Sequence, residues 1–312
     1  MGLTSRKWDP GLSYHKVWHR DEFRCLDRKA KNLSPTLASK RKLRQRQGNS
    51  RKDQIVKIAS WNVNSLNMRM SHLADWLQTA APDVVCLQET KMEDHKFPVQ
   101  ALEDLGYEAA FTGQKSYNGV AILSRCGLSD VCTGFDDVLN AADQRRVIAA
   151  TIRGVRVINV YVVNGQALDS DKFQFKLRWL TALTSLVAAE LSQHRELVLL
   201  GDFNIAPGDL DVYDPIAWGG QIHCSKPERD ALEKLCALGL HDSYRTMMPT
   251  TKAFSWWDYR QAAYARNMGL RIDLALISDA IKARLQAVGI DKNPREQAGP
   301  SDHTPVWLSV TP

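Results

Sequence analysis

Short, wholly apolar runs that stop at a polar residue constrain the fold of this chain more than any other feature of its sequence. Leu197-Val198-Leu199-Leu200 is such a run, and Gly201-Asp202-Phe203-Asn204 follows it directly. Four apolar residues ended by a glycine predict a buried strand that stops abruptly. Side chains two positions apart on extended chain point the same way, so Asp202 and Asn204 are expected to share one site, as an anion and a neutral hydrogen-bonding group. A strand followed by an ordinary Asp/Asn turn explains the same residues.

Similar runs recur along the chain and alternate with segments of helical periodicity. Strands are predicted at residues 55–61, 84–87, 120–124, 146–152, 155–163, 271–277 and 305–310, and Gly154 joins the fourth and fifth as a hairpin. Helices are predicted at residues 69–80 and 228–238, and over a long segment where Phe173, Leu177, Leu180, Leu183, Val187 and Leu191 form an apolar face. Residues 205–227 form a long loop, a feature that tends to be functional in a compact domain. Interleaved strands and helices predict one α/β body.

The charge of the chain is unevenly distributed. The formal net charge is +6, yet residues 1–53 alone hold 15 Lys+Arg and 5 Asp+Glu, so residues 54–312 carry a net charge of −4. We therefore expect a disordered basic arm over residues 1–53 and a folded domain over residues 54–312. The arm is either a solubilising tail or a segment with a nucleic-acid or targeting role.

Composition also bears on the compartment. No apolar run approaches the ~18 residues needed to span a bilayer, so no membrane association is expected. The six cysteines include no CxxC pair, which argues against a disulfide framework or a zinc site and favours a reducing interior. We expect a cytoplasmic protein, with an organelle or the nucleus as the alternatives.

Polar residues gather at the predicted strand ends. They are Asn62, Glu89, Tyr161, Asn164, Asp202, Asn204, Asp273, Asp302 and His303. Any one of them alone is a routine turn residue, but together they predict a shared face. Carboxylates and amides without clustered Cys or His suit Mg²⁺ or Mn²⁺, and such ions work on phosphates. An Asp–Asn pair can hold and deprotonate water, and a protonated His303 can contact the phosphate. Asp273 is a better candidate partner for His303 than Asp302, because adjacent residues on extended chain point apart.

A set of motifs in this order resembles a known family. They are Trp61-Asn62-Val63-Asn64, Leu87-Gln88-Glu89-Thr90-Lys91, Asn118-Gly119-Val120-Ala121, Gln144-Arg145-Arg146, Asn159-Val160-Tyr161, Gly201-Asp202-Phe203-Asn204, Gly269-Leu270-Arg271-Ile272-Asp273 and Ser301-Asp302-His303. The set resembles exonuclease III, a branch of the endonuclease/exonuclease/phosphatase superfamily that includes abasic-site endonucleases. The resemblance covers about residues 55–310 and implies a DNase I-like four-layer α/β sandwich, in which two packed, mainly antiparallel sheets are flanked by helices.

The resemblance also implies an activity and a role for each site residue. It implies Mg²⁺-dependent hydrolysis, with Mn²⁺ as a substitute, at the 3′ ends, nicks or abasic sites of double-stranded DNA, by a monomeric repair enzyme. By position, Glu89 resembles the main metal ligand, with Asn62 and Asp302 close to the ion. Asp202 and Asn204 resemble the groups that orient and activate water. His303, paired with Asp273, resembles the phosphate-contacting group, and Tyr161 resembles a contact to the phosphate or the leaving oxygen.

Other matched positions concern DNA. Trp256, Leu270 and Ile272 resemble the family's apolar pocket for a base-less sugar, and Asn118 and Arg145 fall where relatives touch the DNA backbone. The aromatic cluster around Trp256 fits either base stacking or a core. His223 looks bulkier than the usual occupant of its loop, which leads to the hypothesis that it hinders an internal abasic nucleotide and favours 3′ ends.

The sequence also departs from the family pattern. Ser65 stands where many relatives have Gly, and Val163 where many have Pro. The competing functions are a small-molecule phosphatase or phosphodiesterase on the same scaffold, and a binding module with a dead site. Gln144-Arg145-Arg146 and the Trp256 cluster favour nucleic acid over a small head group, and the intact polar set argues against a dead site.

Overall fold

Two six-stranded sheets form the body of the protein. The computed structural model describes residues 56–134 and 144–312, so the arm predicted over residues 1–53 lies outside the described residues. One sheet has the order β13-β14-β1-β2-β4-β3, and the other has the order β5-β6-β7-β8-β12-β9. The strands of the first sheet are β1 (Val56–Asn62), β2 (Val84–Gln88), β3 (Glu108–Thr112), β4 (Val120–Ser124), β13 (Leu285–Ile290) and β14 (Val306–Val310). Those of the second are β5 (Ser129–Thr133), β6 (Val147–Ile152), β7 (Val155–Tyr161), β8 (Leu197–Asp202), β9 (Leu240–Asp242) and β12 (Asp273–Ser278).

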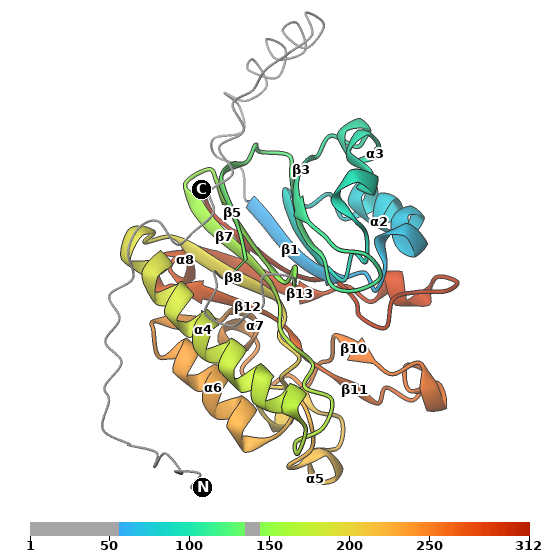
Figure 1. The fold of residues 1–312 in the computed structure, drawn as a ribbon, viewed down its shortest axis with the longest axis vertical. Coiled ribbons are helices and arrows are strands. Elements are labelled where there is room, and N and C mark those ends of the chain that lie inside the picture. Colours follow the sequence, from blue (N-terminus) through green and yellow to red (C-terminus); the bar gives the residue numbers. More distant parts are fainter. Residues whose placement is uncertain (1–55, 135–143) are drawn as a thin grey trace, which may run out of the picture.

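Helices cover the outer face of each sheet, which gives four layers (Figure 1). The first sheet is covered by α2 (Leu66–Thr79) and α3 (Val99–Asp104), and the second by α4 (Asp171–Gln193) and α6 (Lys226–Cys236). Shorter helices are α5 (Pro215–Trp218), α7 (Ser243–Met247) and α8 (Asp279–Lys282). A small ribbon of β10 (Trp256–Trp257) and β11 (Gly269–Leu270) stands apart from both sheets. Each large sheet contains one parallel pair, β1–β2 or β7–β8, and is otherwise antiparallel. The predicted four-layer sandwich is confirmed.

The apolar runs are continuous because both faces of each central strand are buried. In β8, Val198 and Leu200 pack into the core between the sheets, while Leu197 and Leu199 pack against α4 and α6. In β2, Val84 and Cys86 likewise face the inter-sheet core, while Val85 and Leu87 face α2 and α3. Side chains alternate between faces with a period of two, so one run supplies two cores.

The structure adds elements that the sequence pattern does not predict and moves some boundaries. Strands β3, β5, β9 and β13 carry weaker apolar patterns and lie at or near the sheet edges. Helix α2 begins at Leu66, ahead of residue 69. The strand predicted from residue 271 begins at Asp273, and the preceding backbone N–H groups donate outside the sheet, that of Arg271 to the Asp211 backbone oxygen and that of Ile272 to the Ser255 hydroxyl. Within the described residues, no helix has both the length and the apolar character needed to cross a bilayer.

Candidate active site

The predicted polar residues lie at strand ends that meet at one edge of the sandwich. Asn62 ends β1, Glu89 follows β2, and Tyr161 and Asp202 end the parallel strands β7 and β8. Sheet register places Tyr161 beside Asp202, and antiparallel pairing places Asp273 at the start of β12 opposite Asp202. A parallel pair exposes equivalent ends together, and an antiparallel neighbour adds the start of its strand to the same edge.

Gly201 allows β8 to approach β7 closely enough for this arrangement. Its φ is +147°, and a Cβ added there would lie 1.9 Å from the backbone oxygen of Val160. No side chain fits at that distance, so only glycine is compatible with the turn that presents Asp202. The apolar run followed by glycine therefore has a steric reason as well as a conformational one.

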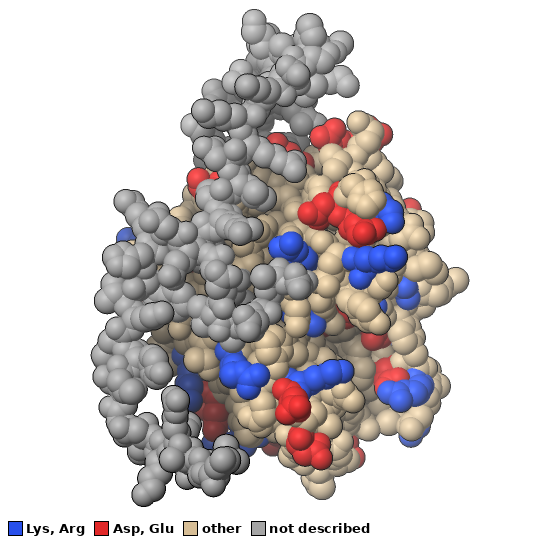
Figure 2. Space-filling model, in the orientation of Figure 1, with Lys and Arg blue, Asp and Glu red and all other residues tan. Residues whose placement is uncertain are grey.

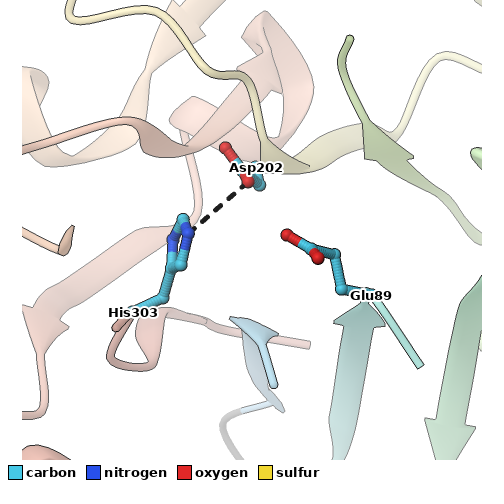
Figure 3. Close-up of side chains that lie close together, drawn as sticks. All are labelled: Glu89, Asp202 and His303. Atoms are coloured by element: carbon cyan, nitrogen blue, oxygen red, sulfur yellow. Dashed lines mark ion pairs between the residues drawn. The ribbon is translucent and has the colours of Figure 1, made fainter. Parts of the chain in front are cut away.

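Three residues from distant parts of the chain converge at the centre of the site (Figure 3). Glu89, Asp202 and His303 each contribute one ligand-type atom to a group whose members all lie within 4.8 Å of one another. The Asn62 amide joins two of them, because its Nδ2 donates to Glu89 Oε1 and to Asp202 Oδ2, both at 2.9 Å. The side-chain oxygen Oδ1 of Asn62 accepts the backbone N–H of Asn64 at 3.0 Å. The shared face predicted from the strand ends is thus present.

Asp202 is held by several donors and is buried. The Asn204 backbone N–H donates to Asp202 Oδ1 at 2.9 Å, and Asn204 Nδ2 lies 3.3 Å from Asp202 Oδ2. Asn164 Nδ2 donates to Asn204 Oδ1 at 3.2 Å, which extends the amide chain by one residue. Burial raises the pKa of Asp202 to about 7, against the attraction of His303, while Asp273 adds to the rise. A carboxylate with a pKa near neutrality is matched to accepting a proton from water.

His303 lies between two carboxylates. Its Nδ1 is 2.9 Å from Asp273 Oδ2 and 3.1 Å from Asp273 Oδ1, and its Nε2 is 3.7 Å from Asp202 Oδ2. Burial would lower the pKa of His303, but the charges of Asp273 and then Asp202 outweigh it and raise the pKa to about 10. The predicted pairing of His303 with Asp273 is present, and the imidazole is a cation at neutral pH.

Tyr161 stands beside the same group and is accompanied by a residue that sequence reasoning missed. Burial, with the charges of Glu89 and Asp202, raises the pKa of Tyr161 well above its usual value, so the phenol keeps its proton. The Arg146 guanidinium lies 4.4 Å from the Tyr161 ring centre, and its NH1 donates to the Tyr161 backbone oxygen at 3.2 Å. Arg146 follows Arg145 in the Gln-Arg-Arg motif, so the motif identifies this segment, while the resemblance assigns a role only to Arg145.

The donor set fits a hard divalent cation. Glu89 and Asp202 offer carboxylate oxygens, whereas a protonated His303 has no lone pair for a metal. The Asn62 amide turns its Nδ2 toward these carboxylates, and its Oδ1 accepts from Asn64 instead. Lys91 Nζ lies 2.9 Å from Glu89 Oε2 and offsets its charge, a contact that the pattern Glu89-Thr90-Lys91 did not signal. Asp302 has other partners: its Oδ1 accepts from Asn64 Nδ2 at 2.9 Å, and its Oδ2 accepts from Trp256 Nε1 at 3.0 Å.

The candidate DNA residues form two groups. Leu270 and Ile272 are buried in an apolar cluster against which Trp256 packs, and the His223 ring centre lies 6.4 Å from that of Trp256. Burial lowers the pKa of His223 to about 4, so its imidazole is neutral. Elsewhere, Asn118 Nδ2 and the Arg145 backbone N–H both donate to Gln114 Oε1. On the face drawn in Figure 2, basic side chains form separate groups interspersed with acidic ones.

Two sheets that gather carboxylates, amides and a charged imidazole at one edge define a class of protein, the α/β-sandwich hydrolases of phosphate esters. The sequence profile of the endonuclease/exonuclease/phosphatase family matches residues 59–303, and the chain belongs to this family.

The relatives are similar over nearly their whole length. Exodeoxyribonuclease III of Haemophilus influenzae is 34% identical over 264 residues, which cover 81% of this chain and 98% of the relative. The structure of the 3′-5′ exonuclease NExo from Neisseria meningitidis is similar with 50% identity and a TM-score of 0.80, covering 82% of this chain and 99% of NExo. An AP endonuclease from Archaeoglobus fulgidus has 36% identity and a TM-score of 0.78, with coverage of 82% and 99%. These likenesses confirm the predicted exonuclease III resemblance and DNase I-like fold.

Proposed function

We propose that this chain is a DNA repair nuclease of the exonuclease III type, a hydrolase of phosphodiesters at DNA 3′ ends. The proposal rests on one observation, the presence of two complementary groups within one buried site. They are the Asp202 carboxylate, whose pKa is about 7, and the cationic imidazole of His303. Hydrolysis of a phosphodiester needs both a proton acceptor for water and a positive donor for the phosphate. The named relatives supply the substrate class, since they include a 3′-5′ exonuclease and an exodeoxyribonuclease III.

In the proposed mechanism, Asp202 accepts a proton from the attacking water, and Asn204 and Asn164 fix the water's orientation. His303 donates from Nε2 to a non-bridging phosphate oxygen, while Asp273 holds its Nδ1. Tyr161 donates its phenolic hydrogen to the phosphate or the leaving oxygen, and Arg146 adds positive charge behind the ring. Glu89 would hold a Mg²⁺ ion, with Asn62 and Asp302 close to it, and the ion would neutralise charge at the phosphate; Mn²⁺ is expected to substitute.

We further propose which residues contact the DNA substrate. Trp256, Leu270 and Ile272 form the apolar surface that receives the terminal or base-less sugar, and Asn118 and Arg145 contact the DNA backbone. The substrates are double-stranded DNA with 3′ ends or nicks and, with lower preference, abasic sites. We also propose that the enzyme acts as a monomer and works in the cytoplasm.

The test compares substrates and one variant. Purified protein is assayed with Mg²⁺ and with chelator on 3′-recessed, nicked, 3′-phosphate and internal abasic duplexes, and on a phospholipid head-group ester. Cleavage of the 3′-terminal substrates by the wild type, abolished by chelator and lowered ~10²-fold or more in Asp202→Asn, is expected. Hydrolysis of the head-group ester alone would instead support a small-molecule phosphatase or phosphodiesterase. Turnover of Asp202→Asn within a few-fold of wild type would refute the role of Asp202.

A further inference from the structure

An ion pair with no solvent exposure lies directly behind the Asp202–Asn204 turn. Lys176 of α4 and Glu228 of α6 are both 0% exposed, and the ammonium is paired with Glu228 Oε1. Charged residues of these types are rarely buried completely, because removing either ion from water is unfavourable and their mutual attraction repays this only with good geometry and additional hydrogen bonds. A hydrophobic pair would pack the two helices as well, so the position of this pair calls for an explanation beyond packing.

The remaining contacts of Lys176 lead to the two amide residues of the site. Its Nζ donates to the backbone oxygen of Asn204 at 2.8 Å and to that of Asn164 at 3.1 Å. These are the residues whose side chains are joined by the Asn164 Nδ2 to Asn204 Oδ1 hydrogen bond. One ammonium therefore fixes the backbone under both members of the amide pair. With Glu228 as its third partner, the ammonium uses all three of its hydrogens.

Asn204 needs such support because of its backbone conformation. Its φ is +51°, in the left-handed region, which asparagine adopts more readily than most residues but still at a cost that the surrounding contacts offset. The same residue directs its N–H to Asp202 Oδ1 and its side-chain amide to the Val162 backbone oxygen and toward Asp202 Oδ2. A change in this backbone would move both groups that hold the proposed proton acceptor.

Glu228 connects the pair to the far end of the long loop. Its oxygens accept the backbone N–H of His223 and of Ser225, each at 3.1 Å, and the Ser225 hydroxyl at 2.6 Å. Lys176 holds Asn204 just before residues 205–227, so the ion pair anchors both ends of this segment. The His223 Nδ1 contact to the Asn204 backbone oxygen, at 2.7 Å, closes the same network.

We propose that Lys176, with its charge balanced by Glu228, is a positioning residue that fixes Asn204 relative to Asp202 for attack on the phosphate. The inference rests on the proposed function and deepens it, because it assigns to a buried ion pair the alignment of the water-orienting amide. Lys176 acts only through Asn204 and Asn164. A displacement of about 1 Å in such a group lowers turnover by up to ~10²-fold.

The experiment separates positioning from folding by removing the charge in two ways. Lys176→Met leaves Glu228 buried without its cation, so both thermal stability and turnover are expected to fall. The double variant Lys176→Met with Glu228→Gln is neutral, so its Tm is expected to recover. Its single-turnover rate on a 3′-recessed duplex should nevertheless stay about 10- to 100-fold below wild type, because the donor to Asn204 is still missing. Its affinity for the DNA in chelator should equal that of wild type.

A matched control exists on the same helix. Arg156 of β7 and Glu190 of α4 form a similarly buried pair, joined at 2.8 and 2.9 Å. Arg156 is five residues from Tyr161 along β7, roughly 16 Å away. The neutral pair Arg156→Met with Glu190→Gln is expected to leave the single-turnover rate within two- to three-fold of wild type. A comparable loss of rate in this control would overturn the proposal, since neutralising any buried ion pair would then lower the single-turnover rate.

The remaining outcomes are also decisive. Recovery of rate together with Tm in the neutral Lys176 and Glu228 variant, or failure of that variant to fold, would assign the pair to stability alone and overturn the proposal. Inactivity of the wild type on every DNA substrate would refute the proposed function instead. The positioning of Asn204 would then be judged by the ¹H–¹⁵N resonance of its side-chain amide in protein labelled on asparagine. This resonance is expected to move in the neutral Lys176 and Glu228 variant and not in the control, and an unmoved resonance would overturn the inference.

Discussion

Neutralising Asp273 is expected to convert a pH-independent cation into a titrating group. Asp273 approaches His303 Nδ1 at 2.9 and 3.1 Å and also accepts the Ser255 hydroxyl at 2.6 Å, and both members of the His–Asp pair are buried. Asparagine has nearly the same shape but carries no charge. Asp273→Asn therefore removes the largest of the carboxylate contributions that raise the pKa of His303, while burial continues to lower it.

The expected size of the effect follows from the pKa. The rise from 6.5 to about 10 corresponds to roughly 5 kcal/mol in favour of the imidazolium, at about 1.4 kcal/mol per pKa unit. An adjacent opposite charge typically accounts for a change of about 1–3 in pKa. Loss of about 2.5 would leave the variant titrating near pH 7.5. At pH 9 only about one molecule in thirty would then carry the charge, and turnover should fall by ~30-fold, while at pH 6.5 it should fall only a few-fold.

The assay is the single-turnover rate of 3′-end cleavage between pH 6.5 and 9, for wild type and Asp273→Asn. The ratio of the two rates is expected to increase with pH. Glu190→Gln, which neutralises the buried partner of Arg156 on α4, serves as the control and should leave the profile parallel to wild type. Profiles of Asp273→Asn and wild type that run parallel over this range would refute the reasoning.

Stability gives an independent measurement of the same pKa. A group whose pKa is higher in the folded than in the unfolded state stabilises the fold fully below its unfolded pKa and loses this contribution as the pH rises through its folded pKa. The His303 contribution is therefore complete below pH 6.5 and is lost by about pH 10. The difference in unfolding free energy between wild type and Asp273→Asn should shrink over that window, as measured by urea unfolding at pH 6.5, 8 and 10.

Three further predictions concern individual positions. Ser65 has φ +93°, so Ser65→Gly relieves strain of ~1–3 kcal/mol against ~0.4–1 kcal/mol of added chain entropy and should raise Tm by a few degrees in a thermal melt; an unchanged or lower Tm would contradict this. Glu89→Gln removes a carboxylate from the proposed metal site and should raise the Mg²⁺ concentration for half-maximal rate by ~10-fold or more; an unaltered Mg²⁺ titration would exclude Glu89 as the main ligand. His223 has φ +70°, which glycine adopts without strain, so His223→Gly should fold and raise the ratio of internal abasic cleavage to 3′-end cleavage. The ratio is measured because the variant also loses the His223 contact to Asn204, and an unchanged ratio would reject the steric hypothesis.

Much of the site was predictable because it depends on local patterns. Apolar runs that stop at a polar residue identified the ends of β1, β2, β7 and β8, and the residues named there lie together at one edge. The runs carry this information because each central strand packs on both faces, so the boundary between apolar and polar residues coincides with the end of the sandwich. The weaker strands β3, β5, β9 and β13 lack that double burial and were missed for the same reason.

The supporting residues behind the site were not predictable in the same way. The periodicity of α4 predicted an apolar face that excludes Lys176, since lysine is normally exposed, yet Lys176 lies buried on that side of the helix. Ser225-Lys226-Pro227-Glu228 does fit a capping box at the start of α6, a signal that could have singled out Glu228. Nothing in that pattern, however, indicates a lysine 52 residues earlier as its partner.

The sequence by itself determined which residues stand at strand ends, that the strands are buried on both faces, and which family the motifs resemble. Only the tertiary structure determined which of those residues are charged at neutral pH. The protonation of His303 and Asp202 depends on contacts of 2.9 to 3.7 Å between segments 30 to 101 residues apart and on nearly complete burial of both side chains. Electrostatic interaction and desolvation change steeply over such distances, so they are properties of the assembled site and not of any stretch of chain.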